Sequence, residues 1–330
     1  MSGTQRRQTM IAPEGEQYPK HRFRRSNVLI AVEHIRRMRG GSQAQLLRGS
    51  DGNYYVVKFP NNPQGTRILV NELICARLAN YLGLPSPGGE VIVVPQELIE
   101  LTSEMNVQMP KGRYQVCAGP CFGSPYVGHP QYRQALTLLP ESDLRNAINI
   151  VEFSGMLLFD LWTCNTDGRQ VVFNRTNESG RYSASMIDNG FCFNGPYWDF
   201  PDSHLRGIYS NRIVYESVEG MDSFEPWLSR IESQVHDRLL IGAGTDVPVE
   251  WQGTSLSCLP CLLARLCRRR RRIRELLWSL AKANVGLFPN WPRGLGVNSG
   301  LGGAVGRVSP RSRRHTTHNV KMQPRHDGVQ

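Results

Sequence analysis

The sequence predicts an α+β protein with a strand-rich amino-terminal part and a mainly helical carboxy-terminal part. Between residues 40 and 125, short runs of Val, Ile, Tyr and Phe alternate with Gly, Pro and Asn, which is typical of strands joined by turns. From about residue 130, apolar residues recur at helical spacing over longer segments. With 330 residues, 40% of them hydrophobic, the chain can bury the core of one large domain or of two lobes.

Residues 40–59 are predicted to form a β-hairpin behind a glycine-rich turn. An Asp-Gly-Asn turn signal at 51–53 stands before the strand 54–59. Backbone N–H groups can approach phosphate oxygens only where side chains are small, so the glycine-rich turn is a candidate for binding a nucleotide. Its four residues are Gly40, Gly41, Ser42 and Gln43. A plain hairpin turn is the alternative, and a Walker-type loop is excluded because no G-x-x-x-x-G-K-[ST] motif occurs.

The most informative residue of this hairpin is a lysine inside an apolar run. Lys58 follows Tyr-Tyr-Val-Val and precedes Phe59, and a charged amine in such a strand is costly unless it has a partner. Glu72 opens a segment with helical spacing of Leu and Ala, and its carboxylate can be that partner. Phosphotransfer enzymes hold nucleotide phosphates with a strand lysine that pairs with a helix glutamate. An ordinary salt bridge is the alternative for these two residues alone.

Further elements are predicted along the amino-terminal part. A helix over 71–82 ends at Gly83, and a turn-rich break then leads to a buried strand over 90–95. The remaining segments are predicted as a short helix over 98–105, a strand over 113–117 and a Gly/Pro-rich loop over 119–124. That loop is the predicted hinge between a strand-rich lobe and a helical lobe.

The carboxy-terminal part is predicted to consist mainly of helices. Residues 143–160 carry the apolar spacing of a mostly buried helix. The following elements are a polar loop over 163–170, short strands over 171–173 and 182–187, and helices over 224–238 and 261–285. Five consecutive arginines, 268–272, lie in the last helix, and a solvated helix end is their expected environment.

Two carboxylates stand beside the short strands. Asp167 lies in the polar loop before them, and Asp188 follows the second strand, where an apolar run stops at Asp-Asn-Gly. In phosphoryl transfer, one carboxylate positions the attacking hydroxyl and another holds the Mg²⁺ that bridges the phosphates. A hairpin between them brings two such residues together. Turn chemistry is the ordinary role of Asp-Gly and Asp-Asn-Gly, but their order after the glycine-rich turn, Lys and Glu favours a nucleotide site.

Several stretches together resemble the HipA-like kinases, which share the bilobal protein-kinase-like fold with the phosphatidylinositol kinases. The matching stretches are Gly-Gly-Ser-Gln at 40–43, Tyr-Val-Val-Lys-Phe at 55–59, Asn-Glu-Leu at 71–73, Trp-Thr-Cys-Asn-Thr-Asp-Gly-Arg-Gln at 162–170, Ile-Asp-Asn-Gly at 187–190 and Phe-Pro-Asn-Trp at 288–291. The chain is most similar to the stand-alone bacterial HipA-like proteins. The resemblance implies a strand-rich, nucleotide-binding N-lobe over 27–125 and a helical C-lobe over 126–292.

The resemblance also implies a role for each matching residue. Lys58 would contact the nucleotide phosphates, Glu72 would orient it, and the glycine-rich turn would lie over the phosphates. Asp167 would be the catalytic aspartate, and Asp188 would bind the metal. The implied activity is Mg²⁺-dependent transfer of the γ-phosphate of ATP, with a serine or threonine hydroxyl of a protein as the expected acceptor.

One position departs from the family pattern. The family places an Asn five residues after the catalytic Asp as a second metal ligand, and Val172, which stands there, cannot ligate Mg²⁺. Arg169 stands where a His is usual. Asn165, Gln170 or Asn174 can supply the missing oxygen without any signal that chooses among them, and we predict Asn165 beside Asp188. The alternative to an active enzyme is a nucleotide-binding pseudokinase that works as an interaction module.

The formal net charge of +11 is concentrated at the two ends of the chain. Residues 1–39 hold nine Lys and Arg against three Glu, and residues 293–330 hold seven against one Asp, so the body between them is nearly neutral. Residues 1–26 and 293–330 are therefore expected to be flexible basic arms. Nucleic acid is expected to bind only through these tails, if at all, because a globular nucleic-acid binder carries its basic excess on the folded domain.

Nothing in the patterns indicates a membrane segment or a disulfide-bonded scaffold. No secretory segment follows Met1, and no apolar run approaches the ~18 residues of a membrane helix, so a cytoplasmic protein without a membrane partner is expected. The eight cysteines are expected to be reduced thiols that pack as small apolar residues. Cys258 and Cys261 form a C-x-x-C pair, but no second pair or histidine at ligand spacing accompanies it, so metal or redox use is not its expected role.

Overall fold

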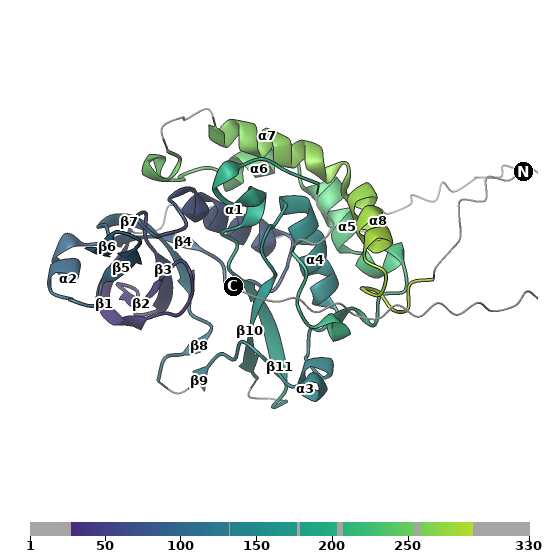
Figure 1. The fold of residues 1–330 in the computed structure, drawn as a ribbon, viewed down its shortest axis with the longest axis horizontal. Coiled ribbons are helices and arrows are strands. Elements are labelled where there is room, and N and C mark those ends of the chain that lie inside the picture. The colour runs from purple at the N-terminus through teal and green to yellow at the C-terminus, as the bar shows by residue number, and fades with distance from the viewer. Residues whose placement is uncertain (1–27, 132, 177–178, 203–206, 254–257, 293–330) are drawn as a thin grey trace, which may run out of the picture. The chain divides into compact units, whose positions relative to one another are not determined.

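Five strands of the amino-terminal part close into a barrel in the computed structural model of the protein, which describes residues 28–131, 133–176, 179–202, 207–253 and 258–292 (Figure 1). In barrel order these strands are β1 (Leu29–Arg37), β2 (Gln45–Gly49), β3 (Tyr54–Lys58), β7 (Gly119–Pro125) and β4 (Glu90–Val94). Neighbouring strands pair antiparallel, except for the parallel pair of β1 with β4 that closes the barrel. The predicted hairpin over 40–59 is confirmed as β2 and β3, whereas β1 is a strand that the sequence patterns did not indicate.

The hinge predicted over 119–124 is wrong, because this segment is the strand β7. It pairs with β3 on one side and β4 on the other, and its Cys121 and Phe122 are buried. A Cβ at Gly123 would lie 3.0 Å from the side chain of Ile92 on β4, so the glycine permits close packing inside the barrel. Gly and Pro indicate a loop locally, but barrel closure makes this segment a strand.

The other elements of the amino-terminal part are two helices and a second hairpin. Its elements are α1 (Arg67–Tyr81), α2 (Gln96–Glu100) and the antiparallel hairpin of β5 (Asn106–Met109) and β6 (Gly112–Gln115). Helix α1 begins four residues before the predicted start at 71 and is buried along most of its length. The helix predicted over 98–105 is wrong in its second half, because α2 ends at Glu100 and β5 follows. The predicted strand over 113–117 is confirmed as β6, shifted by one to two residues.

The predicted buried helix over 143–160 consists of two helices with a break. These are α3 (Glu141–Arg145) and α4 (Glu152–Thr163), and the apolar residues Ile148 and Val151 between them are exposed. Apolar spacing therefore overestimated the length of the helix. The two predicted strands are confirmed as the antiparallel hairpin of β10 (Gln170–Arg175) and β11 (Tyr182–Ile187).

Helices α5 to α8 complete the carboxy-terminal part. They are α5 (Trp227–Ser229), α6 (Asp237–Ala243), α7 (Cys258–Arg270) and α8 (Ile273–Ala283). The helix predicted over 224–238 is confirmed in part, because α5 continues into a π-helical turn at Arg230–Gln234, but α6 begins separately at Asp237. The helix predicted over 261–285 is two helices. The shorter elements are β8 (Gly128–His129), β9 (Arg133–Gln134), a π-helical turn at Arg230–Gln234, and 3₁₀ turns at Cys192–Tyr197, Arg212–Tyr215, Met221–Phe224 and Val249–Trp251.

The five arginines, 268–272, are not all solvated. Arg269 is buried, where its Nε donates to the backbone oxygen of Leu161 at 3.1 Å and its Nη1 donates to Asp202 at 2.6 Å. Arg272, at the break between α7 and α8, donates to the same carboxylate at 3.1 Å. The expectation of a solvated helix end is therefore wrong for Arg269, whereas Arg272 is exposed although it pairs with Asp202.

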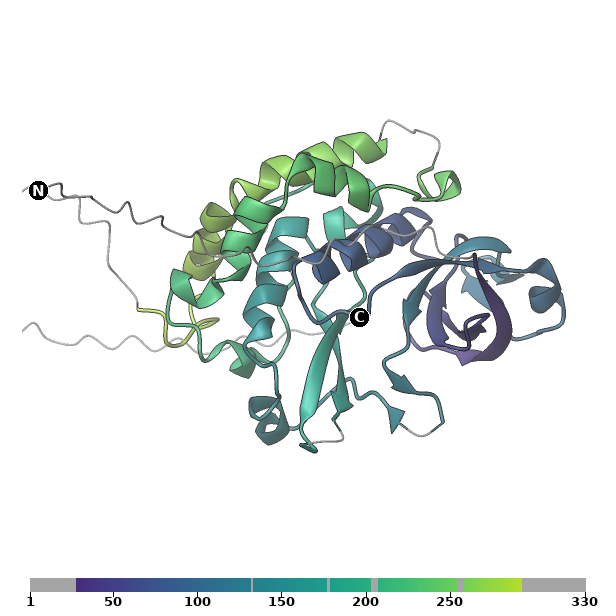
Figure 2. The ribbon, with the colours of Figure 1, turned by 180° about the vertical axis from the view of Figure 1, so that it is seen from behind.

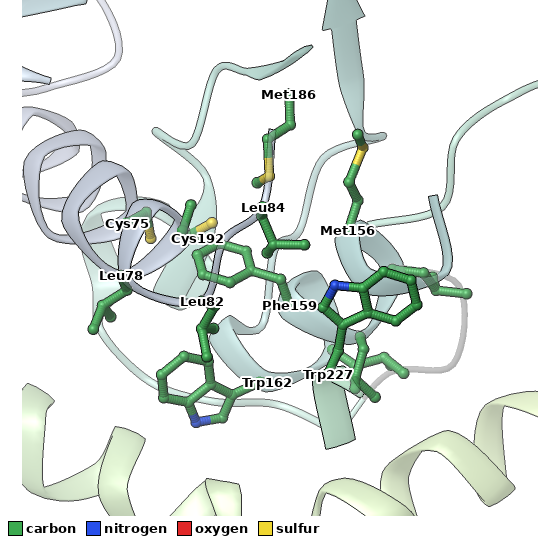
Figure 3. Close-up of a cluster of buried hydrophobic side chains, with 14 of the residues drawn as sticks. Cys75, Leu78, Leu82, Leu84, Met156, Phe159, Trp162, Met186, Cys192 and Trp227 are labelled. Atoms are coloured by element: carbon green, nitrogen blue, oxygen red, sulfur yellow. The ribbon is translucent and has the colours of Figure 1, made fainter. Parts of the chain in front are cut away.

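One hydrophobic core joins α1 to the carboxy-terminal part, and a second fills the barrel. Figures 1 and 2 show α1 between the barrel and α4, and Figure 3 shows side chains of α1, α4 and β11 meeting in the larger core. Trp162 of α4 is fully buried there, and its indole N–H donates to the backbone oxygen of Leu266 on α7 at 3.1 Å. Because burial of one large apolar side chain contributes about 1.5–3 kcal/mol, this shared core holds α1 against α4.

The predicted α+β class, with a strand-rich amino-terminal part and a helical carboxy-terminal part, is confirmed. The arms predicted over 1–26 and 293–330 lie outside the described residues, and so does the side chain of Cys258 in the C-x-x-C pair. Among the residues that the structure describes, no helix combines the length and the apolar character that a membrane crossing requires.

Candidate functional site

A cavity of about 730 Å³ is bounded by the barrel, helix α1 and the β10–β11 hairpin. Its volume lies in the range of small-molecule and cofactor sites. The predicted site residues that line it are Gly40, Gly41, Ser42, Lys58, Glu72, Asp167 and Asp188. Two of the predicted residues, Gln43 and Asn165, are not part of the lining.

Lys58 joins three segments of the chain at the back of this cavity. Its Nζ donates to Glu72 Oε1 on α1 and to Asp188 Oδ1 at 2.8 Å, just beyond β11. The lysine and the glutamate are both buried, with 6% and 3% of their surface exposed. A buried charge is tolerated only when it is paired and hydrogen-bonded, and this amine has two carboxylates.

The three charges change one another's pKa. Burial alone would lower the pKa of Lys58, but the carboxylates of Glu72 and Asp188 outweigh that effect and raise it above its ordinary value. Burial raises the pKa of Glu72, and Lys58 offsets this in part. Burial also acts to raise the pKa of Asp188, but the ammonium group of Lys58 outweighs it and holds that pKa below its usual value. At neutral pH the site therefore holds a charged lysine beside an ionised Asp188, which is what phosphate and metal binding require.

The turn that carries Asp188 is held by two neighbouring residues of α1. Asp188 has a φ of 59°, in the left-handed region that Asp tolerates better than most residues. Glu72 Oε2 accepts the backbone N–H of Asn189 at 3.0 Å. The carboxamide of Asn71 donates to three backbone oxygens of the following loop, those of Gly190, Cys192 and Gly195. Helix α1 therefore positions Lys58 through Glu72, and it positions the turn of Asp188 through Glu72 and Asn71.

Asp167 reaches the cavity from the loop between α4 and β10. Its side chain is exposed, and its backbone N–H donates to Asn165 Oδ1 at 3.1 Å. Asn165 itself is buried, and its Nδ2 donates to Asp160 Oδ1 at 3.0 Å. The structure therefore places Asn165 beneath Asp167, where its carboxamide supports the loop and does not face the cavity.

A buried ion pair beneath this loop was not predicted from the sequence. Arg169 and Asp160 expose 4% and 1% of their surface, and the guanidinium contacts both carboxylate oxygens, with Nε donating to Oδ2 at 2.8 Å. Nη1 of Arg169 also donates to the backbone oxygen of Ile187 at 2.7 Å and to Asn189 Oδ1 at 3.2 Å. Arg169 therefore links the loop of Asp167 to the turn of Asp188. Its place where the family has His was the one sequence signal that marked it.

Side-chain hydrogen bonds of Gln43 connect the glycine-rich turn to the β5–β6 hairpin. This residue has a φ of 51°, its Oε1 accepts the backbone N–H of Gln108 at 2.7 Å, and its Nε2 donates to the backbone oxygen of Gln108 at 2.8 Å. Arg37 also donates to Gln43 Oε1. The sequence predicted that Gln43 would bind the nucleotide, whereas the structure uses its side chain to fix the turn that lines the cavity.

Replacing Gln43 with Ala is expected to loosen the turn and weaken ADP binding by about three- to tenfold, because each lost hydrogen bond is worth about 0.5–1.5 kcal/mol. Titration calorimetry with ADP measures this change. The matched control is Gln108→Ala, which keeps the backbone groups that Gln43 contacts and should bind ADP as the wild type does. Equal ADP affinities for the wild type and both variants would show that the hydrogen bonds of Gln43 do not affect nucleotide binding.

The residues of the cavity fit a nucleotide and a divalent cation. Oε1 of Gln64 is buried without a hydrogen-bond partner among the described residues, and Gln64 lines the cavity below the glycine-rich turn. A Cβ at Gly41 would lie 3.1 Å from Gln64 Nε2, so a larger residue in the turn would crowd this amide. In the described part of the chain no three His, Cys, Asp or Glu side chains gather into a ready metal site. Mg²⁺ needs fewer, because it takes one or two carboxylates together with substrate phosphates.

A family model described as HipA-like kinase matches residues 31–257. Among solved structures, the chain is similar to the Golgi casein kinase with Mn and ADP bound, at 12% identity over 77% of this chain and 75% of that one, with a TM-score of 0.44. It is also similar to the Helicobacter pylori proinflammatory kinase CtkA, at 13% identity over 76% of this chain and 95% of that one, with a TM-score of 0.48. No curated protein matches the sequence.

Proposed function

This chain belongs to the HipA-like kinase family, and from that premise we propose that it transfers the γ-phosphate of ATP, with Mg²⁺, to a serine or threonine hydroxyl of a protein. The observation that carries the proposal is the contact of Lys58 with both Glu72 and Asp188 in a cavity that Asp167 also lines. Four charged groups from distant parts of the chain converge there, which an ordinary structural salt bridge does not require.

Lys58 and the glycine-rich turn would hold the phosphates. The lysine stays protonated because two carboxylates raise its pKa, so it can neutralise phosphate charge. Glu72 keeps the amine in place through its buried carboxylate, and the hydrogen bonds of Gln43 keep the turn beside the cavity. Asp188 would be a ligand of Mg²⁺, which supplies charge neutralisation on the transferring phosphoryl group.

Asp167 would position the attacking hydroxyl and accept its proton. Its carboxylate is exposed to the cavity, and its Oδ1 accepts the backbone N–H of Gly168 at 2.8 Å, which leaves the other oxygen available. Asn165 accepts a hydrogen bond from the backbone of this loop, and Arg169 pairs with the buried Asp160. These contacts fix the loop, so the carboxylate of Asp167 is held in a defined position.

The proposal assigns the activity to the cytoplasm. ATP is available there, and the free thiols of the described cysteines stay reduced in that compartment. The seven such residues are Cys75, Cys117, Cys121, Cys164, Cys192, Cys261 and Cys267.

A second candidate function is a nucleotide-binding pseudokinase. Val172 lines the cavity at the position where the family has a metal-ligating Asn, and its side chain offers no oxygen. Such a protein would bind ATP without transferring phosphate and would act as an interaction module.

Labelling with γ-³²P-ATP in the presence of Mg²⁺ tests the two candidates. The wild-type protein is expected to turn over ATP and label itself or an added protein, and Lys58→Met is expected to lose this activity. Lys111→Met, which replaces an exposed lysine in the β5–β6 turn, is the matched control and should keep it. Because Lys58→Met leaves two carboxylates unpaired, its fold is checked by circular dichroism.

The possible outcomes separate the two candidates. Nucleotide binding without turnover in the wild type would support the pseudokinase, and the absence of nucleotide binding would contradict both. Turnover that survives in a folded Lys58→Met protein would contradict the role of the lysine.

A further inference from the structure

Three side chains share one face of strand β10, and two of them line the cavity. In a strand, residues two apart share a face, so Gln170, Val172 and Asn174 point the same way. The first two line the cavity, and the third does not. Val172 is the position that would carry the second metal ligand of the family, so a replacement ligand has to come from its surroundings.

The register of the hairpin places Gln170 beside the metal-binding turn. Gln170 pairs with Ile187, the residue directly before Asp188. Asn174 pairs with Ser183, and four residues along a strand correspond to about 13 Å from Gln170. Of the two amides on this face of β10, the one on Gln170 is therefore nearer to Asp188 along the hairpin.

The side-chain amide of Asn165 already makes hydrogen bonds within the protein. Asn165 is buried, with its oxygen accepting the backbone N–H of Asp167 and its nitrogen donating to Asp160. Gln170, by contrast, is exposed, and none of the hydrogen bonds found within the described part of the chain involves its carboxamide. Amide oxygens are accepted ligands of hard divalent cations, and the side chain of Gln is long enough to serve from a neighbouring position on the strand.

We propose that the side-chain oxygen of Gln170 is the second protein ligand of the divalent cation, together with the carboxylate of Asp188. The inference rests on the proposed nucleotide and metal site, and it identifies which residue takes over the function that Val172 lacks. Chemically, the site then offers one carboxylate, one amide oxygen and the phosphates of the nucleotide, a ligand set of the kind that Mg²⁺ and Mn²⁺ accept.

Mn²⁺ binding in the presence of ADP tests the proposal without relying on activity. Free Mn²⁺ is measured by electron paramagnetic resonance during titration of the full-length protein, and ADP affinity without metal is measured by calorimetry. Gln170→Ala is expected to weaken Mn²⁺ binding by about tenfold or more, the range in which loss of a supporting group weakens metal sites, while metal-free ADP binding is unchanged. Asn174→Ala is the matched control and should bind Mn²⁺ as the wild type does.

The double variant Gln170→Ala/Val172→Asn sharpens the test. It restores an amide oxygen at the position where the family has its Asn, and is expected to recover Mn²⁺ binding to within about threefold of the wild type, a difference of less than 1 kcal/mol. Unchanged Mn²⁺ affinity in Gln170→Ala would overturn the proposal, as would a loss in Asn174→Ala that equals or exceeds it. A wild-type protein that binds Mn²⁺ with ADP through Gln170 but transfers no phosphate would contradict the kinase activity and leave the ligand assignment standing.

Discussion

Replacing Asp167 with Asn is expected to lower phosphate transfer by about 10²–10⁴-fold while ADP affinity and thermal stability stay at wild-type values. The carboxylate is exposed in the cavity, so its charge contributes little to the fold. Asn keeps the shape and the contact with the N–H of Gly168, but it cannot accept the proton of the attacking hydroxyl. The effect should therefore fall on the transfer step alone.

Single-turnover transfer from γ-³²P-ATP measures this rate, and calorimetry measures ADP binding. Asp143→Asn, which neutralises an exposed carboxylate on α3, is the matched control and should transfer phosphate as the wild type does. Transfer at the wild-type rate in Asp167→Asn would rule out its role as the catalytic base. Loss of ADP binding together with transfer would mean that the residue shapes the nucleotide site instead.

Replacing Arg169 with Met is expected to destabilise the protein by about 3–5 kcal/mol, because it leaves the carboxylate of Asp160 buried without its charge partner. The same substitution removes the contacts to Ile187 and Asn189, so ADP affinity should fall as well. Arg48→Met is the matched control: its pair with Glu33 is about half exposed, and its loss should cost less than about 1 kcal/mol. Urea denaturation measures the free energy of unfolding of both variants.

The pH dependence of this loss follows from the pKa of Asp160. Burial already raises that pKa above its ordinary value, although the guanidinium of Arg169 opposes the effect. Without the guanidinium the pKa rises further, and a carboxyl group with a raised pKa favours the folded state when it is protonated. The difference in stability between Arg169→Met and the wild type should therefore be smaller at pH 5 than at pH 8. A difference that stays constant or widens on acidification would contradict an unpaired carboxylate as its cause.

Local patterns were enough to predict much of the fold and the charged residues of the cavity. The hairpins β2–β3 and β10–β11 follow from β-branched runs bounded by turn residues, a signal that depends only on near neighbours. Lys58 and Asp188 stood out because a charged residue interrupts or ends an apolar strand. The resemblance to the HipA-like kinases is confirmed by the family match over residues 31–257.

Elements whose form depends on distant partners were mispredicted. The glycines and prolines of Gly119–Pro125 indicate a loop. The segment is nevertheless a strand, because β3 and β4 pair with it on its two sides. The apolar residues Ile148 and Val151 read as part of a buried helix, yet they lie exposed in the break between α3 and α4. Both errors arise because tertiary contacts override local propensity.

By itself, the sequence determined the α+β class, the placement of a charged lysine in a strand and the pairing of two short strands between two aspartates, since each depends on residue type and spacing along the chain. Tertiary structure decided that Lys58 contacts a carboxylate 130 residues away, that Arg169 neutralises Asp160, and that the side chain of Asn165 turns inward while Gln170 lines the cavity. These are contacts and orientations across the fold. They are set by which surfaces the core brings together and by the requirement that every buried charge finds a partner, and no local pattern encodes them.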